Sequence, residues 1–363
     1  MRTQWGVPER KYWSDSVTFL ERLRSLGWFL AASAWFLFSD LVAQRAASGL
    51  TQGEAQEPLY RWFLLFLLVL GYGLMSRFHA GGSHADRQEP GSSARSLGLE
   101  RRPGWGREIA LGAALGWAGA VACVLPAALS GDLVVTLFTS GHQWGMLVLE
   151  VMALAAGTLA VEVAFRGYPF QRLVEAMGPG LATLFMAAIY AIWWTHTAPA
   201  TRATMLVTFL LGWVLALAYL RTRALWVSWG LHFAWAAVLG IALGLPVAGP
   251  MSYSPIVVTN SRGAGWVAGG LEGPEGSAFG VMVAFLLLFA VVSLTADLKH
   301  KYGYERIVPG GIPVDLDAAA RQQHEAAMGA AAAQEPTLVQ IQGAGDRGQS
   351  SEISDQSSEN SEQ

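Results

Sequence analysis

The 363-residue chain is 53% hydrophobic and only 14% charged, whereas a soluble domain usually carries about 25% charged residues. This deficit excludes an ordinary soluble globular fold and indicates segments that lie in lipid. The net charge of −3, with basic residues spread over many loops, argues against a nucleic-acid-binding protein.

Eight stretches are long and apolar enough to form membrane-spanning helices, since hydrocarbon satisfies no backbone N–H or C=O group. In chain order they are 26–43, 59–76, 109–129, 146–165, 181–198, 203–220, 224–243 and 278–296. The sequence therefore predicts an all-α, polytopic membrane bundle of about eight transmembrane helices. No cleavage pattern follows the first stretch, so residues 1–25 are expected to be a retained cytoplasmic N-terminus.

Polar segments divide the rest of the chain. Within the N-terminal part, 26–143, the Gly-, Ser- and Arg-rich residues 77–107 predict a flexible inner loop between the second and third helices. Residues 311–363 contain too little apolar surface to repay the entropy of ordering, which predicts a disordered cytoplasmic tail. Residues 146–296 form the predicted membrane core.

The distribution of Lys and Arg predicts the orientation in the membrane. With the N-terminus in the cytoplasm, the cytoplasmic segments 1–25, 77–107, 166–177, 220–224 and 298–306 carry 18 basic residues. The opposite side carries four, which are Arg45, Arg61, Arg202 and Arg262. Both termini are therefore expected in the cytoplasm. The Ala, Gly and Arg usage is typical of a GC-rich bacterium, so we expect a bacterial inner (plasma) membrane.

Ionisable residues inside spanning helices are costly and often functional. Asp40 and Glu150 lie near helix ends, where snorkelling or a local hydrogen bond explains them. Four others lie in three neighbouring predicted helices, namely Glu162, Arg166, His196 and His232. The first two stand four residues apart with the acid first, the favoured order for a helical ion pair. A purely structural pair explains these two equally well, and a single histidine on an apolar face is usually a core residue.

A glutamate and two histidines in one bundle suggest two chemistries. They can ligate zinc, or they can activate a water without a metal. At 1.5 Å rise per residue, Glu162 reaches the depth of His196 and His232 only if its helix continues to about Val174. We therefore expect that extension. A divalent metal such as zinc would be held by Glu162, His196 and His232, although the sequence requires no cofactor.

At these residues the sequence resembles the CAAX protease and bacteriocin-processing (CPBP) family of intramembrane proteases. The family pattern is Glu-Glu-x-x-x-Arg, then Phe-x-x-x-His, then His-x-x-x-Asn or Asp, on successive helices. The matching segments are VEVAFRGYPFQRL (161–173), AIWWTHT (191–197) and SWGLHFAWA (228–236). WVAGGLEGPEGS (266–277) also looks like the loop before the last helix in many bacterial members. The resemblance covers about 146–296.

The resemblance implies roles for the matched residues, and two departures bear on them. Val161 stands at the first glutamate and Ala236 at the Asn or Asp, while Ile192 at the phenylalanine is a mild change. In the family, the first glutamate and the first histidine are assigned to water activation. The last histidine and the asparagine are assigned to the oxyanion, and the part played by a metal is disputed.

Two main hypotheses follow. The first is an intramembrane endopeptidase acting on a membrane-associated peptide or a prenylated protein. In this hypothesis Glu162, or a shifted equivalent, acts together with His196 as the base. His232 donates a hydrogen bond to the oxyanion, and Arg166 keeps Glu162 ionised. The alternative is a catalytically inactive relative that binds or scaffolds a membrane partner. A transporter is a third reading, but the sequence lacks paired broken helices. Expected partners are membrane lipid and a peptide or protein substrate, and no nucleic acid.

Overall fold

The computed structural model describes residues 19–80, 94, 97–195, 201–247, 253–295 and 325–326. Two predicted segments lie wholly or almost wholly outside these residues, the part of the N-terminus before residue 19 and the tail at 311–363, and so does about half of the inner loop, 81–93 and 95–96. His196 also lies outside them. The chain divides into two compact units, Met1–Tyr302 and Gly303–Gln363, and the elements described below belong to the first.

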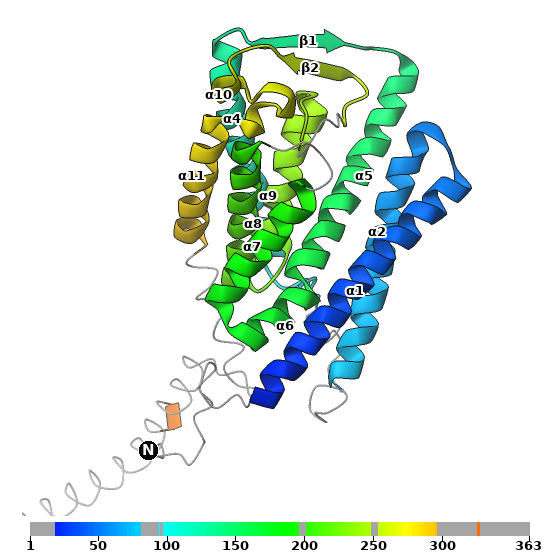
Figure 1. The fold of residues 1–363 in the computed structure, drawn as a ribbon, viewed down its shortest axis with the longest axis vertical. Coiled ribbons are helices and arrows are strands. Elements are labelled where there is room, and N and C mark those ends of the chain that lie inside the picture. The colour runs from blue at the N-terminus through cyan, green and yellow to red at the C-terminus, as the bar shows by residue number, and fades with distance from the viewer. Residues whose placement is uncertain are drawn as a thin grey trace, which may run out of the picture. The chain divides into compact units, whose positions relative to one another are not determined.

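The first unit is a bundle of helices (Figure 1). Its longer helices are α1 (Phe19–Leu50), α2 (Gln56–Ala80), α4 (Trp105–Leu129), α5 (Gly141–Arg166) and α8 (Arg202–Thr222). The shorter ones are α6 (Tyr168–Met177), α7 (Pro179–Thr195), α9 (Trp226–Ala236), α10 (Gly265–Ala268) and α11 (Ala278–Leu294). The end of α9 continues as a π-helix over Ala237–Ala242. Each of the eight predicted stretches coincides with one of these helices, which confirms the all-α bundle.

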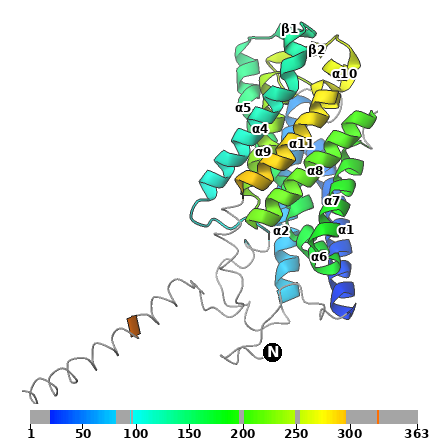
Figure 2. The same ribbon diagram turned by 90° about the vertical axis from the view of Figure 1, so that its left-hand side faces the viewer.

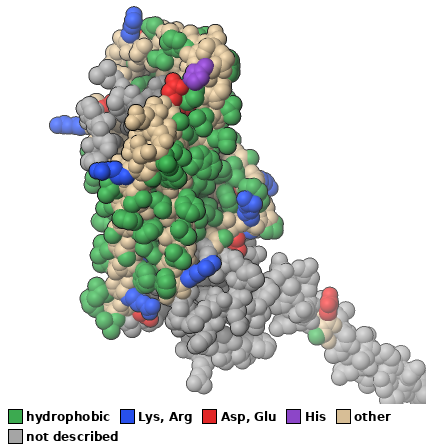
Figure 3. Space-filling view, turned by 90° about the vertical axis from the view of Figure 1, so that its right-hand side faces the viewer, with side chains coloured by type: hydrophobic (Ala, Val, Ile, Leu, Met, Phe, Trp, Pro, Cys, Tyr) green, Lys and Arg blue, Asp and Glu red, His purple; other side chains and the backbone are tan. Residues whose placement is uncertain are grey.

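Within the described residues, length and composition qualify five helices as membrane spans: Phe19–Leu50, Gly53–Phe78, Trp105–Leu129, Gly141–Met177 and Arg202–Thr222. The remaining three predicted spans correspond to the shorter apolar helices Pro179–Thr195, Trp226–Ala242 and Ala278–Leu294. Large apolar side chains such as Phe66 and Phe289 are exposed on the bundle surface, and hydrophobic side chains cover most of the face drawn in Figure 3. Such a surface suits lipid, so the protein is an integral membrane protein.

The predicted extension of the fourth span is present but broken. Helix α5 ends at Arg166, and α6 continues the chain to Met177 after a break at Gly167. A Cβ at Gly167 would lie 2.4 Å from the carbonyl oxygen of Val163, so this turn needs glycine. Pro169 follows in the first turn of α6, where a residue without an N–H is tolerated.

A short antiparallel strand pair, which the sequence did not predict, lies across one end of the bundle. Strand β1 (Leu133–Leu137) pairs with β2 (Val257–Ser261) in antiparallel register, with Leu133 opposite Ser261 and Leu137 opposite Val257. Figures 1 and 2 show this pair across the end from which α5 starts. It joins two connections that are far apart in sequence, one after α4 and one before α10.

Helix α9 is held by unusually close packing on α4. A Cβ at Gly112 would lie 2.1 Å from the carbonyl oxygen of Val227, and one at Gly116 would lie 2.2 Å from that of Leu231. Small residues at such crossings let two membrane helices approach at the backbone. The depth and rotation of α9 therefore depend on these two glycines.

We predict that Gly116→Ala lowers the thermal unfolding midpoint of the protein in detergent, because the added methyl meets backbone that cannot move aside. Overpacking of this kind costs about 1–3 kcal/mol. The control is Gly145→Ala on α5, where nothing lies within 4 Å of the new Cβ. Alanine exceeds glycine in helix propensity, so the control midpoint should stay equal or rise. Equal midpoints for the two variants would contradict the close crossing.

Candidate active site

A buried ion pair at the end of α5 forms the base of the site. Glu162 and Arg166 are both fully buried, and Nη1 of Arg166 lies 3.2 Å from Oε1 of Glu162. The Nη2 of Arg166 donates to the carbonyl oxygen of Gly212 on α8 at 3.3 Å. The guanidinium carbon also lies 4.3 Å from the centre of the Tyr190 ring. The predicted helical pair is therefore present, and it joins α5 to α7 and α8.

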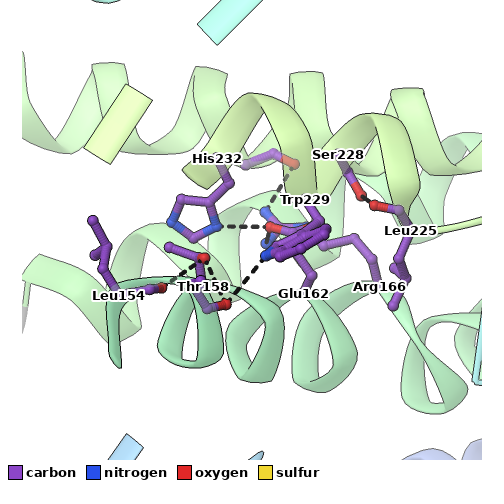
Figure 4. Close-up of polar contacts among 10 residues, drawn as sticks. Leu154, Thr158, Glu162, Arg166, Leu225, Ser228, Trp229 and His232 are labelled. Carbon is purple, nitrogen blue, oxygen red and sulfur yellow. Dashed lines mark hydrogen bonds and ion pairs between the residues drawn. The ribbon is translucent and has the colours of Figure 1, made fainter. Parts of the chain in front are cut away.

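His232 on α9 contacts the same carboxylate. Its Nδ1 lies 2.8 Å from Oε1 of Glu162, as Figure 4 shows. When Glu162 is ionised and His232 neutral, Nδ1 carries the ring hydrogen and Nε2 presents a lone pair on the opposite side. When the ring is protonated, Nε2 is a donor. The edge of Tyr190 packs against the imidazole, with ring centres 6.3 Å apart.

A cavity of about 620 Å³ begins at this imidazole. Its wall comes from α1, α2, α5, α7, α8 and α9, together with the connections that carry Tyr253 and Glu275. His232 lines the cavity, whereas Glu162 and Arg166 lie behind it and do not. A ligand in the cavity can therefore touch His232 directly and meets the ion pair only through it.

Comparison with known protein families finds a match, and it covers the segment that carries this site. Residues 142–238, about a quarter of the chain, match the Rce1-like family described as type II CAAX prenyl endopeptidases. This match to CAAX prenyl endopeptidases supports the resemblance of the membrane core to the CPBP family. The matched segment runs from the start of α5 through α9 and includes Glu162, Arg166 and His232. No curated protein and no solved structure matches the chain significantly.

The two departures from the CPBP pattern both lie on the cavity wall. Val161, at the position of the first glutamate, lines the cavity from α5, and Ala236 lines it from α9. Neighbouring helix positions point about 100° apart, which is why Val161 faces the cavity while Glu162 faces Arg166 and His232. A ligand therefore meets apolar side chains at the positions of the CPBP glutamate and asparagine.

The structure adds a carboxylate to this wall that sequence reasoning did not single out. Glu275 lies in a single 3₁₀ turn, Pro274–Gly276, and is only 4% exposed. Its Oε1 accepts a hydrogen bond from Nε1 of Trp235 at 3.3 Å. Because Trp235 stands three residues after His232, its indole starts from nearly the same face of α9. Glu275 thus reaches the cavity wall about one helical turn from His232.

The loop that carries Glu275 is held in place by its neighbour Glu272. The carboxylate of Glu272 accepts hydrogen bonds from the backbone N–H of Thr201 at 2.6 Å and from the Thr201 hydroxyl at 2.9 Å. It also accepts one from the hydroxyl of Thr204. These contacts fasten the loop to the start of α8, as an N-terminal cap does. The GPEGS segment is part of the family resemblance. Its glutamate, Glu275, lies outside every predicted span, and the sequence pattern therefore predicts no role for it.

The described residues do not assemble a metal site around Glu162. Its Oε1 already accepts from Arg166 and faces Nδ1 of His232, so these two candidate ligands bind one another instead of a shared ion. Within the part of the chain that the structure describes, no group of three or more His, Cys, Asp and Glu side chains could hold a metal. Any set that includes His196 falls outside the described residues.

We predict that Arg166→Leu destabilises the protein strongly, because it leaves the buried Glu162 carboxylate without its cation. Breaking one half of a buried pair costs about 3–5 kcal/mol. The double variant Glu162→Gln/Arg166→Leu should recover part of the loss, measured as the thermal midpoint in detergent.

The control for this cycle is Glu54→Gln. Glu54 pairs with His142 on the surface, with both side chains about two-thirds or more exposed, and exposed pairs contribute about 0–1 kcal/mol. Additive losses in the double variant would show that Glu162 and Arg166 do not depend on each other.

Proposed function

We propose that the protein is an intramembrane endopeptidase of the CPBP family that hydrolyses a peptide bond in a membrane-associated polypeptide. The proposal rests mainly on the Arg166–Glu162–His232 chain, which ends with a ring nitrogen on a cavity wall. A carboxylate that fixes the orientation of an imidazole beside a cavity is the arrangement that acid–base and oxyanion chemistry require. The proposed location is a bacterial inner membrane.

In this proposal Glu162 is a positioning residue and not the base. Its carboxylate accepts from His232 and Arg166 and stays behind the imidazole. Protonated His232 would then donate its Nε2–H to the oxyanion that forms when water attacks the peptide carbonyl carbon. Donors of this kind contribute about 10²–10³-fold in rate.

Glu275 would supply the base that Val161 cannot. The carboxylate takes a proton from the attacking water and returns it to the leaving amine, so that one peptide bond is exchanged for an amine and an acid. The Trp235 N–H holds the carboxylate toward the cavity. His196, which directly follows the last residue of α7, remains the predicted partner of the base.

The alternative is a catalytically inactive family relative that binds a membrane partner. Val161 and Ala236 favour it, because both stand on the cavity wall where a CPBP protease presents polar groups. On this alternative the buried ion pair and His232 only hold α5, α8 and α9 together. The cavity would then bind a polypeptide without cleaving it.

Cleavage of a library of membrane-associated peptides by the purified protein tests the proposal. We expect Glu275→Gln to lower the cleavage rate about 10²–10⁴-fold, the usual contribution of a general base. His232→Ala and His196→Ala should each abolish cleavage without loss of the folded protein. Glu21→Gln, at the exposed start of α1 and outside the cavity lining, is the matched carboxylate control and should cleave normally.

Two outcomes would favour the inactive relative instead. One is no cleavage by the unaltered protein, together with peptide binding that His232→Ala leaves unchanged. The other is cleavage that Glu275→Gln and His232→Ala both leave intact, which would trace the activity to a contaminating protease.

A further inference from the structure

The cavity opens at one end of the bundle. Half of its lining residues are buried, including Thr158, Tyr190 and Trp235, and most of the others are partly buried. The exposed ones are all polar and lie where α1 ends and α2 begins, namely Gln44, Arg45, Ser48, Gln56 and Glu57. The mouth is therefore at the connection between α1 and α2, and the imidazole of His232 lies at the inner limit.

The other end is closed by packed side chains. Below Glu162 the core contains Phe165, Tyr168, Phe170, Tyr219 and Leu225, each at most 4% exposed. The rings of Phe170 and Tyr219 meet edge to face with centres 5.8 Å apart. Among the described residues, these side chains separate His232 from the end of the bundle that carries α6.

The two ends differ in their basic residues. In the described part of the chain, the closed end carries nine arginines besides the buried Arg166, namely Arg22, Arg24, Arg77, Arg101, Arg102, Arg107, Arg172, Arg221 and Arg223. The open end, which adjoins the strand pair β1–β2, carries four, namely Arg45, Arg61, Arg202 and Arg262. Lys and Arg accumulate on the cytoplasmic side of a membrane protein. The closed end is thus assigned to the cytoplasm and the mouth to the opposite side.

The cavity also has a chemical gradient from mouth to floor. Charged and amide side chains surround the mouth, where Arg61 is paired with Glu57 and Glu150 at 3.1 and 3.4 Å. Deeper in, aromatic side chains such as Phe36, Trp193 and Trp235 form the wall. This gradient suits an extended polypeptide whose apolar side chains enter first while its polar flank stays at the interface.

We propose that the cavity takes its ligand from the extracytoplasmic half of the membrane, and that this ligand is an extracytoplasmic stretch of a membrane-anchored polypeptide. The cleavage of this polypeptide in the cavity rests on the proposed function, whereas the side of the membrane from which the cavity is reached does not. A prenylated C-terminus at the cytoplasmic surface would lie on the closed side. The inference therefore separates this chain from the substrate class in its family's description.

Cysteine accessibility tests the direction of access. In a Cys123→Ser background, single cysteines are placed at Ser48 in the mouth and at Val161 deep in the cavity. Gly141→Cys and Gly180→Cys mark the two ends of the bundle, and nothing lies within 4 Å of the new Cβ at either position. The probe is a charged, membrane-impermeant thiosulfonate applied to bacterial spheroplasts that express the full chain.

We expect the cysteines at 48, 141 and 161 to react in intact spheroplasts, and the cysteine at 180 to react at least tenfold faster after permeabilisation. A cysteine at 161 that reacts only after permeabilisation, or not at all, overturns the proposal. So does the reverse pattern at 141 and 180. Adding Glu275→Gln removes catalysis but should leave the labelling unchanged, because access does not depend on cleavage. If the labelling pattern is as expected but the unaltered protein cleaves no peptide, only the endopeptidase proposal is refuted and the direction of access stands.

Discussion

The burial of one positive charge organises the centre of this protein. A guanidinium buried in a lipid-surrounded bundle is stable only when an anion balances its charge and acceptors bind its N–H groups. Arg166 meets this demand with Glu162, a carbonyl on α8 and the face of Tyr190. The same carboxylate orients His232 on α9. One electrostatic requirement thus fixes α5, α7, α8 and α9 relative to one another and also fixes the imidazole on the cavity wall.

Packing complements this interaction from the other side of α9. Glycines on α4 allow backbone contact that no larger residue would permit, so α9 is held between α4 and the ion pair. A rigid support matters because a reactive group about 1 Å out of place loses much of its effect. The adaptable part of the molecule is then the cavity wall, and it is there that Val161 and Ala236 depart from the family pattern.

The helices and the meeting of Glu162, Arg166 and His232 could be predicted because membrane burial makes apolar length and each internal charge informative. Three features could not. The break at Gly167 depends on local crowding by Val163. Strands of five residues such as Leu133–Leu137 give too short a pattern to distinguish from a loop. Glu275 lies in a connection that folds back into the bundle, and only tertiary structure shows that a loop acid lines a membrane cavity.

The division of the cavity wall between chain segments has an evolutionary consequence. Helices α1 and α2 form the mouth but contribute none of the proposed reacting groups, and they precede the segment that carries the family motif. Selectivity for a polypeptide can therefore diverge by substitution in the first two helices while the chemistry of the core is conserved. Recruitment of new targets would require no change in the machinery that processes them.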